Sequence, residues 1–188
     1  EITVAELVKK AGYDTFHAGK WHLSNVKTEG KDAAKKHGFD ETVSPAGTSG
    51  SATHLVEAFT GWLGNRRDKS RPFFAYLAPH ETHEDVSLWA PAEYRRKFPV
   101  AEARNASDKM LYGRVPKYGR NSRSGDPRVY YAALAQLDDA FGNLLRYLER
   151  AELRDNTFIF FTSDNGPEHR AKYSFGSPGN LRGVKGHL

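Results

Sequence analysis

Three short strand candidates, separated by longer stretches with helical spacing, constrain the fold more than any other feature of this sequence. They are Thr15–Ala18, Phe73–Ala78 and Thr157–Thr162, and the last two are continuous apolar runs. Continuous apolar runs are typical of strands that a parallel sheet buries on both faces, and we expect this of Phe73–Ala78 in particular. Strands that alternate with helices indicate an α/β fold with a layered sheet.

Helical signals lie before and between these runs. Thr3 and Glu6 have the spacing of a capping box, which predicts a helix at the start of the chain with a stop at Gly12. Apolar residues at helical spacing predict a second helix over about Ala52–Arg66. The clearest helical pattern opens at Pro127, where leucines recur at three- and four-residue steps.

Other stretches have little periodicity. Asn25–Gly50 is polar and is interrupted by glycine, serine and proline, which predicts mostly loop. One or two helical turns are expected within Ala90–Phe98. Residues 99–126 carry many arginines, lysines and glycines, so we expect a loop insertion there, within a partial domain that spans residues 1–188.

Composition excludes several classes of protein. The 188 residues are 38% hydrophobic, which is enough for a core, and no apolar run approaches the ~18 residues of a membrane-spanning helix. There is no cysteine, so this chain has no disulfide, thiolate zinc site or cysteine nucleophile. No secretory signal is recognisable after Glu1. The net charge of +5 favours anionic partners without naming one.

Each strand candidate is followed at once by polar side chains that could carry chemistry. Lys20 and His22 follow the first candidate, His80 and His83 the second, and Asp164 with Asn165 the third. Ligands of open α/β sheets bind at the carboxyl ends of the strands. If the three strands are parallel neighbours, these side chains converge on one edge.

Taken singly, each of these residues has an ordinary alternative role. Asp164 and Asn165 suit a hard cation such as Ca²⁺ or Mg²⁺, but Ser-Asp-Asn-Gly is also a favourable turn. His80 and His83 suit acid–base work or metal binding, and equally an exposed or packed position. Lys20 and His22 could donate to an oxyanion or simply be exposed, and Lys185 alone would be an ordinary solvated lysine.

Five motifs resemble those of the type I sulfatases. Gly12–Leu23 is similar to the pattern GYxTxxxGKWHLG of that family, with Ser24 in place of its last glycine. The other four matches, in the family's order, are Arg71–Ala78 with His83, Tyr130–Asp138, Asp155–Glu168, and Leu181–Lys185. The resemblance implies an alkaline-phosphatase-like sandwich with a mostly parallel central sheet flanked by helices.

The resemblance also implies roles for single residues. Lys20, His22, His83 and Lys185 match residues that bind the sulfate group and assist its transfer, and they are the expected catalytic set. Asp164 and Asn165 match two ligands of the family's divalent cation, usually Ca²⁺, with Mg²⁺ as the alternative. His80 has no clear match, and His169, which follows the fourth motif, could reach the site. The implied substrate is a sulfated small molecule or sulfated glycan, and the family favours a periplasmic or extracellular location.

The family's nucleophile is a formylglycine, made from cysteine or serine in a CxPSR-type motif near an acidic pair of metal ligands. Neither feature is in this sequence. The expectation is therefore an internal sulfatase fragment, inactive alone, whose formylglycine and remaining metal ligands lie upstream.

Two alternatives remain open. One is a phosphodiesterase or phosphonate hydrolase of the same superfamily, which the GKWH and LRGxK motifs disfavour. The other is a non-catalytic binder of sulfated glycans or nucleic acid, using the basic stretch Arg95–Arg128. No nucleic-acid-binding motif is present, so we expect no nucleic-acid partner.

Overall fold

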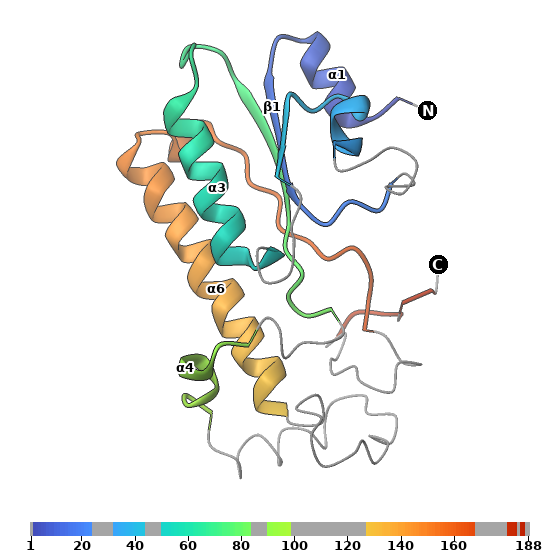
Figure 1. The fold of residues 1–188 in the computed structure, drawn as a ribbon, viewed down its shortest axis with the longest axis vertical. Coiled ribbons are helices and arrows are strands. Elements are labelled where there is room, and N and C mark those ends of the chain that lie inside the picture. Colours follow the sequence, from blue (N-terminus) through green and yellow to red (C-terminus); the bar gives the residue numbers. More distant parts are fainter. Residues whose placement is uncertain are drawn as a thin grey trace. The chain divides into compact units, whose positions relative to one another are not determined.

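The structure, a computed structural model, describes residues 2–23, 32–43, 50–83, 90–98, 127–167, 180–183 and 185–186 (Figure 1). The chain divides into two compact units. The first unit comprises residues 1–80 and 137–151, and the second comprises residues 81–136 and 152–188. The insertion expected at 99–126 lies outside the described residues and stays a prediction.

A three-stranded parallel sheet forms the centre of the first unit. Its order is β2 (Glu41–Val43), β1 (Asp14–Gly19) and β3 (Phe73–Ala78). β1 pairs along its whole length with β3, from Asp14 opposite Phe73 to Gly19 opposite Ala78. The predicted α/β class with parallel strands is confirmed for this unit.

Side chains of β1 alternate between two covered faces of the sheet. Phe16 packs on one face against Phe59 and Trp62 of α3 (Ala52–Asn65), with ring centroids 5.8 and 4.9 Å apart. The helix was expected over nearly these residues, because its buried positions recur at helical spacing. α3 therefore covers the face of the sheet to which Phe16 points.

The opposite face receives the first helix, α1 (Val4–Lys10), and the 3₁₀ helix η1 (Ala33–His37). Ala5 of α1, Ala34 of η1 and Phe39 form a buried cluster there. The expected capping box is present, since Thr3 accepts a hydrogen bond from the amide of Glu6 and Glu6 accepts one from the amide of Thr3. Figure 1 shows α1 and α3 on opposite sides of β1.

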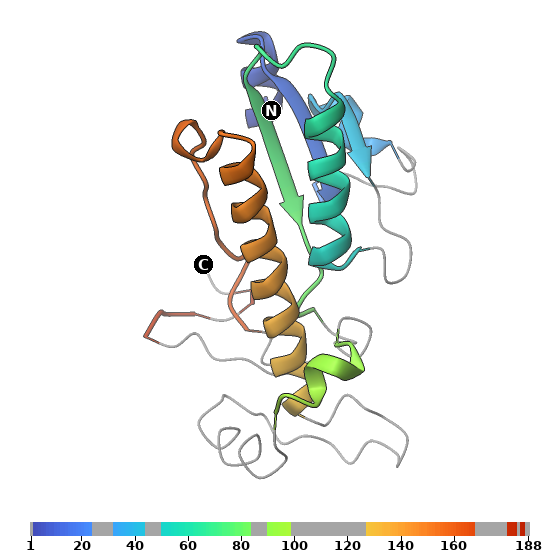
Figure 2. The same cartoon turned by 90° about the vertical axis from the view of Figure 1, so that its left-hand side faces the viewer.

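The longest helix, α6, spans Pro127–Arg150, as its leucine spacing predicts. Its residues from Leu137 onward belong to the first unit, where they run beside α3 (Figure 2). The Tyr147 hydroxyl donates a hydrogen bond to the carbonyl oxygen of Thr60 over 3.1 Å and links the two helices. Among the described residues, no helix has the length and apolar character needed to cross a membrane.

The second unit contains the start of α6, the short helix α4 (Ala92–Arg95) and the 3₁₀ helix η5 (Arg154–Asn156). Its core cluster consists of small side chains, against which Tyr94 and Phe98 pack; the members are Ala90, Val129, Ala132 and Ala133. The helical turns expected within Ala90–Phe98 are confirmed as α4.

The strand expected at Thr157–Thr162 is not formed. The segment carries no strand pairing in the structure, and Phe158, Phe160 and Phe161 are 91%, 77% and 64% exposed. An apolar run becomes a buried strand only when neighbouring backbone satisfies its peptide groups and covers its side chains. None of the other described segments provides that pairing.

Two further expectations are wrong in part. The stretch predicted as loop at Asn25–Gly50 contains η1 and β2 among its described residues 32–43. Phe73–Ala78 is a strand, but it is half-buried rather than buried on both faces, and Tyr76 is 44% exposed. The reason is its position, because β3 is an edge of this three-stranded sheet while β1 is central.

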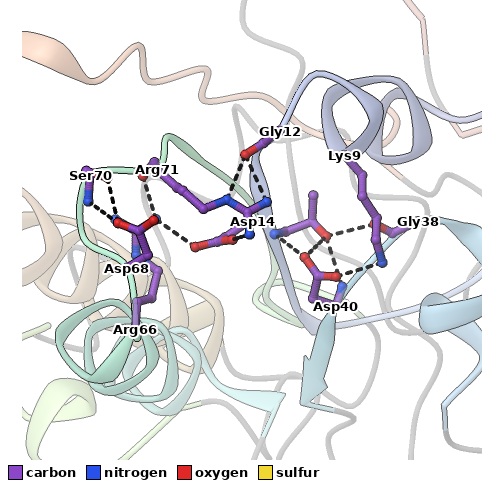
Figure 3. A network of polar contacts seen from close by, with 10 residues as sticks. Lys9, Gly12, Asp14, Gly38, Asp40, Arg66, Asp68, Ser70 and Arg71 are labelled. Atoms are coloured by element: carbon purple, nitrogen blue, oxygen red, sulfur yellow. Dashed lines mark hydrogen bonds and ion pairs between the residues drawn. The ribbon is translucent and has the colours of Figure 1, made fainter.

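Two carboxylates fasten the amino-terminal end of β1 (Figure 3). Asp40 accepts hydrogen bonds of 2.9 Å from both the amide and the hydroxyl of Thr15, and forms an ion pair of 2.6 Å with Lys9. Asp14 forms ion pairs with Arg66 at 3.3 Å and with Arg71 at 3.1 Å. These contacts join the strand to α1 and to the segment before β3.

Truncating Phe59 should destabilise the 188-residue chain, whereas truncating Phe160 should not. Phe59 is 3% exposed, so Phe59→Ala should lower the free energy of unfolding by about 3–5 kcal/mol. Phe160 is 77% exposed, and Phe160→Ala should change it by about 0.5 kcal/mol or less. Urea unfolding followed by circular dichroism measures both. A similar loss in the two variants would contradict the exposed position of Phe160.

Asp40→Asn should weaken the first unit in a pH-dependent way. Burial opposes the charge on Asp40, but hydrogen bonds from Lys9 and Thr15 outweigh it and lower the pKa of the carboxyl below its ordinary value of 3.8. A lowered pKa stabilises the folded state above about pH 4 and loses that effect as pH falls through the folded value. The loss should be about 1 kcal/mol at pH 7, because water screens this half-exposed pair, and should shrink toward pH 3. The control is Glu57→Gln on the exposed side of α3; equal pH profiles for the two variants would refute the role of Asp40.

Candidate functional site

The first part of the candidate site is the carboxyl end of β1, where Gly19 and Lys20 meet the end of β3. Gly19 has a φ of +107°, and a Cβ there would collide with the carbonyl oxygen of Ala78. The amide of Lys20 donates a hydrogen bond of 2.8 Å to that same oxygen. Only glycine allows this close approach, so the backbone of Lys20 is fixed against the last residue of β3.

Trp21 anchors the residues that follow. Its ring packs edge-on against His17, with centroids 5.2 Å apart, and lies against the buried cluster that contains Phe39. Lys20 is half-buried and His22 is exposed. Lys20 and His22 therefore flank an anchored tryptophan at the carboxyl end of a buried strand.

His80 lies two residues beyond the end of β3. Its amide donates a hydrogen bond of 3.2 Å to the carbonyl oxygen of Gly50, just before α3. Because β1 and β3 are parallel neighbours in register, Lys20 and His80 follow strand ends at the same edge of the sheet. The sequence-based expectation that these two strands are parallel neighbours is confirmed.

In the second unit, Asp164 and Asn165 lie in a tight bend. The Ser163 hydroxyl donates to the carbonyl oxygen of Asn165 over 2.6 Å, and the Asn165 side-chain amide donates to the carbonyl oxygen of Gly166 over 2.8 Å. A carbonyl only accepts hydrogen bonds, so these contacts fix the amide nitrogen of Asn165 toward Gly166. Both Asp164 and Asn165 are exposed, so the structure is compatible with a simple turn and with a pair of cation ligands.

Lys185 lies close to the same bend. Its amide donates a hydrogen bond of 2.9 Å to the carbonyl oxygen of Pro167, two residues after Asn165. Gly183 and Gly186 on either side have φ values of +92° and +84°, which lets the backbone turn sharply. The structure thus connects two motifs that lie about twenty residues apart in the chain, the Asp164 bend and the Lys185 turn.

His83 is exposed, and its neighbour Thr82 is tied to α6. The Thr82 side chain hydrogen-bonds the hydroxyl of Tyr130. Burial raises the pKa of Tyr130, and the bond with Thr82 opposes part of that rise, so the hydroxyl is protonated at neutral pH. The sequence motif around Tyr130 gave no hint of this contact.

Sequence reasoning also missed His17, the fully buried histidine of β1. Both of its ring nitrogens make hydrogen bonds, one to Thr42 of β2 and one to the carbonyl oxygen of Lys20. The sequence signal that could have identified His17 was a titratable side chain inside a predicted strand.

The predicted residues thus fall into three groups: Lys20 with His22, the Asp164 bend with Lys185, and His83 beside Thr82. Their meeting around one cavity stays a prediction. His169 and Ser24 lie outside the described residues. Among the residues that the structure describes, no three histidine, aspartate or glutamate side chains cluster as a metal site.

Comparison with known proteins identifies the family to which this chain belongs. The family model described as sulfatase matches residues 1–187. The chain belongs to the sulfatase family. The resemblance read from the five motifs is confirmed.

Among similar proteins of this family are two from humans. The human N-acetylgalactosamine-6-sulfatase is 30% identical over 88% of this chain and 33% of its own length. The human arylsulfatase A is 28% identical over 99% of this chain and 39% of its own length. The chain therefore spans about a third of the length of the curated relatives it matches.

Solved structures agree on the fold. A protein solved with its substrate D-glucosamine-2-N,6-O-disulfate has a TM-score of 0.59 and 19% identity, covering 93% of this chain and 52% of that one. The protein yidJ of Bacteroides fragilis has a TM-score of 0.67 and 18% identity, covering 92% and 47%. The chain has the alkaline-phosphatase-like α/β fold of the sulfatases.

A methyl group at Gly19 should disrupt the candidate site, whereas one at Gly61 should not. Gly19→Ala places a Cβ against the Ala78 carbonyl at a strained φ, so it should cost more than about 2 kcal/mol in unfolding free energy. Gly61 lies in α3 with open space around it, and Gly61→Ala should stabilise by about 0.5–1 kcal/mol. Chemical denaturation tests the pair, and a neutral Gly19→Ala would refute the close approach of β1 and β3.

Proposed function

We propose that the full-length protein hydrolyses sulfate esters, with a sulfated glycan or sulfated small molecule as substrate. The observation that carries this is the end of β1, where Gly19 brings the backbone of Lys20 against Ala78. The strand end holds a cationic side chain on a rigid, buried support, which suits an anionic group. The names of the relatives, among them the human N-acetylgalactosamine-6-sulfatase, support the sulfate ester as that group.

Lys20 and Lys185 are the proposed sulfate-binding cations. As the S–O bond of the ester breaks, negative charge grows on the departing oxygen and remains on the sulfuryl oxygens. Ammonium groups held near these oxygens stabilise that charge more in the transition state than in the ground state. This requires side chains on fixed backbone, a condition that the Lys20–Ala78 and Lys185–Pro167 hydrogen bonds favour.

A histidine is the proposed general acid. A sugar alkoxide is a poor leaving group, and proton donation from His22 or His83 would convert it to an alcohol as the S–O bond breaks. Both histidines are exposed in this chain, so both are accessible to a substrate. Thr82 and Tyr130 give His83 the additional support of a neighbouring side-chain hydrogen bond.

The chemistry of Asp164 and Asn165 fits a hard divalent cation. A carboxylate and an amide oxygen are the ligand types that Ca²⁺ and Mg²⁺ prefer, and the Asn165 amide nitrogen is already turned toward Gly166. Two residues are fewer ligands than such an ion needs, so we propose that other parts of the protein complete the set. When bound, the cation would neutralise charge on the sulfate oxygens.

The nucleophile is proposed to be a formylglycine outside these 188 residues, because this chain contains no cysteine and no CxPSR-type motif. By the same family reasoning, we propose that the protein works in the periplasm or outside the cell. All activity tests therefore use the full-length protein.

The proposed roles predict different dependences on the leaving group. Lys20→Ala and Lys185→Ala should each lower kcat/KM by about 10²–10³ for every sulfate ester, because the charge on the sulfate oxygens is common to all of them. Replacing the general acid with alanine should cost about 10²–10⁴ for a sugar sulfate. The cost should be much less for 4-nitrophenyl sulfate, since nitrophenolate leaves without a proton. One of His22→Ala and His83→Ala should show this pattern.

Lys10→Ala and Lys69→Ala are the matched controls, because both side chains are exposed and lie in the segments that precede β1 and β3, before the amino-terminal ends of these strands. Both should retain wild-type kcat/KM. Hydrolysis of bis(4-nitrophenyl) phosphate in preference to any sulfate would favour the phosphodiesterase alternative and overturn the proposal. Binding of sulfated glycans without turnover of any ester would favour the non-catalytic alternative.

A further inference from the structure

His17 occupies an unusual position for a titratable side chain. It lies in the middle of the central strand β1, and its side chain is fully buried. Its Nδ1 lies 2.8 Å from the Thr42 hydroxyl of β2, and its Nε2 lies 3.3 Å from the carbonyl oxygen of Lys20. A histidine in a core costs free energy unless both nitrogens are satisfied, and here both are.

The partners determine the tautomer. The carbonyl oxygen of Lys20 only accepts hydrogen bonds, so Nε2 carries the proton and donates it. Nδ1 of the neutral ring is then an acceptor, and the Thr42 hydroxyl is its donor. Burial lowers the pKa of His17 and the bond to Lys20 opposes part of that shift, so the neutral form is the one present near pH 7.

Aromatic side chains hold the ring in this orientation. Trp21 meets it edge-on at 5.2 Å, Tyr76 of β3 stacks on it at 5.8 Å, and Phe39 lies at 5.5 Å. A ring packed on these sides has no room to rotate to another rotamer. The Nε2–H group is therefore fixed in direction as well as in protonation.

Both backbone polar groups of Lys20 are hydrogen-bonded. The Lys20 amide donates to the carbonyl oxygen of Ala78 in β3, and the Lys20 carbonyl oxygen accepts from His17. With amide and carbonyl both bonded, the direction in which the Lys20 side chain leaves the backbone is set. His22 lies two residues further along the chain, after the same fixed backbone of Lys20.

We propose that His17 is a positioning residue, which orients Lys20 for sulfate through the hydrogen bond from its Nε2 to the Lys20 carbonyl. This inference rests on the sulfate-binding role proposed for Lys20. His17 itself does not touch the substrate. It acts only by fixing the backbone carbonyl of Lys20.

Two amide substitutions separate this role from a general packing role. In His17→Gln the side-chain amide nitrogen corresponds to Nε2 and can still donate to the Lys20 carbonyl. In His17→Asn the side chain reaches only as far as Nδ1, so it keeps the Thr42 contact and loses the Lys20 contact. Thr42→Val removes the other contact and keeps the donor to Lys20.

The assay is kcat/KM of the full-length protein on 4-nitrophenyl sulfate, with melting temperature measured in parallel. His17→Asn should lower kcat/KM by about 10- to 100-fold, since a small displacement of a binding group has effects of this size. His17→Gln and Thr42→Val should stay within about threefold of wild type, although all three variants lose some thermal stability. Equal activity of His17→Asn and His17→Gln, or activity that follows melting temperature across the three variants, would overturn the proposal.

A second readout separates this inference from the proposed function. Amide hydrogen exchange at Lys20–His22 should be faster in His17→Asn than in His17→Gln, whatever the reaction is. If Lys20→Ala retains full activity while the exchange difference is present, the sulfate-binding role of Lys20 fails and the contact from His17 stands. If exchange at Lys20–His22 is the same in both variants, the positioning role itself is refuted.

Discussion

The close approach of β1 and β3 at their carboxyl ends is the constraint on which the first unit and its candidate residues depend. A side chain at Gly19 would occupy the space of the Ala78 carbonyl, and that same carbonyl accepts the amide of Lys20. The contact sets the register of six residue pairs along the strands. It also determines where β1 and β3 end, and therefore where Lys20 and His80 lie along the edge of the sheet. The backbone geometry that glycine allows thus determines the position of the cation for which we propose a sulfate-binding role.

The central strand carries polar side chains in a buried position, and their bonding explains how it does so. Thr15 is held by Asp40 and the carbonyl of Gly38, and His17 is held by Thr42 and Lys20. These partners, apart from Lys20, come from residues 38–43, which comprise β2 and the three residues before it. This segment therefore does more than extend the sheet. It satisfies polar atoms that would otherwise make β1 unstable in a core.

Much of this fold could be predicted from local signals. The capping box at Thr3, the helical spacing in α3 and α6 and the apolar run of β3 each depend on neighbouring residues, and each is confirmed. β2 escaped prediction because three residues in a polar stretch show no period, and only the pairing with β1 makes them a strand. The strand expected at Thr157–Thr162 was wrong for the converse reason, since its apolar signal was strong but no described segment pairs with it. His17 was missed because its partner Thr42 lies 25 residues away, within a stretch predicted as loop.

The two sets of candidate residues differ in how the protein supports them. Lys20 follows a strand whose side chains are buried, and its own backbone amide and carbonyl are both hydrogen-bonded. Asp164 and Asn165 follow a segment with exposed phenylalanines, and the bonds within their bend join residues at most two positions apart. Local bonds of this kind hold a turn but do not fix its direction relative to a core. A divalent cation, whose ligands must meet at one point, would add the constraint that the bend itself lacks. The end of β1, where we propose that sulfate binds, is thus built in advance by packing, while the proposed cation would supply the longer-range constraint at the acidic bend.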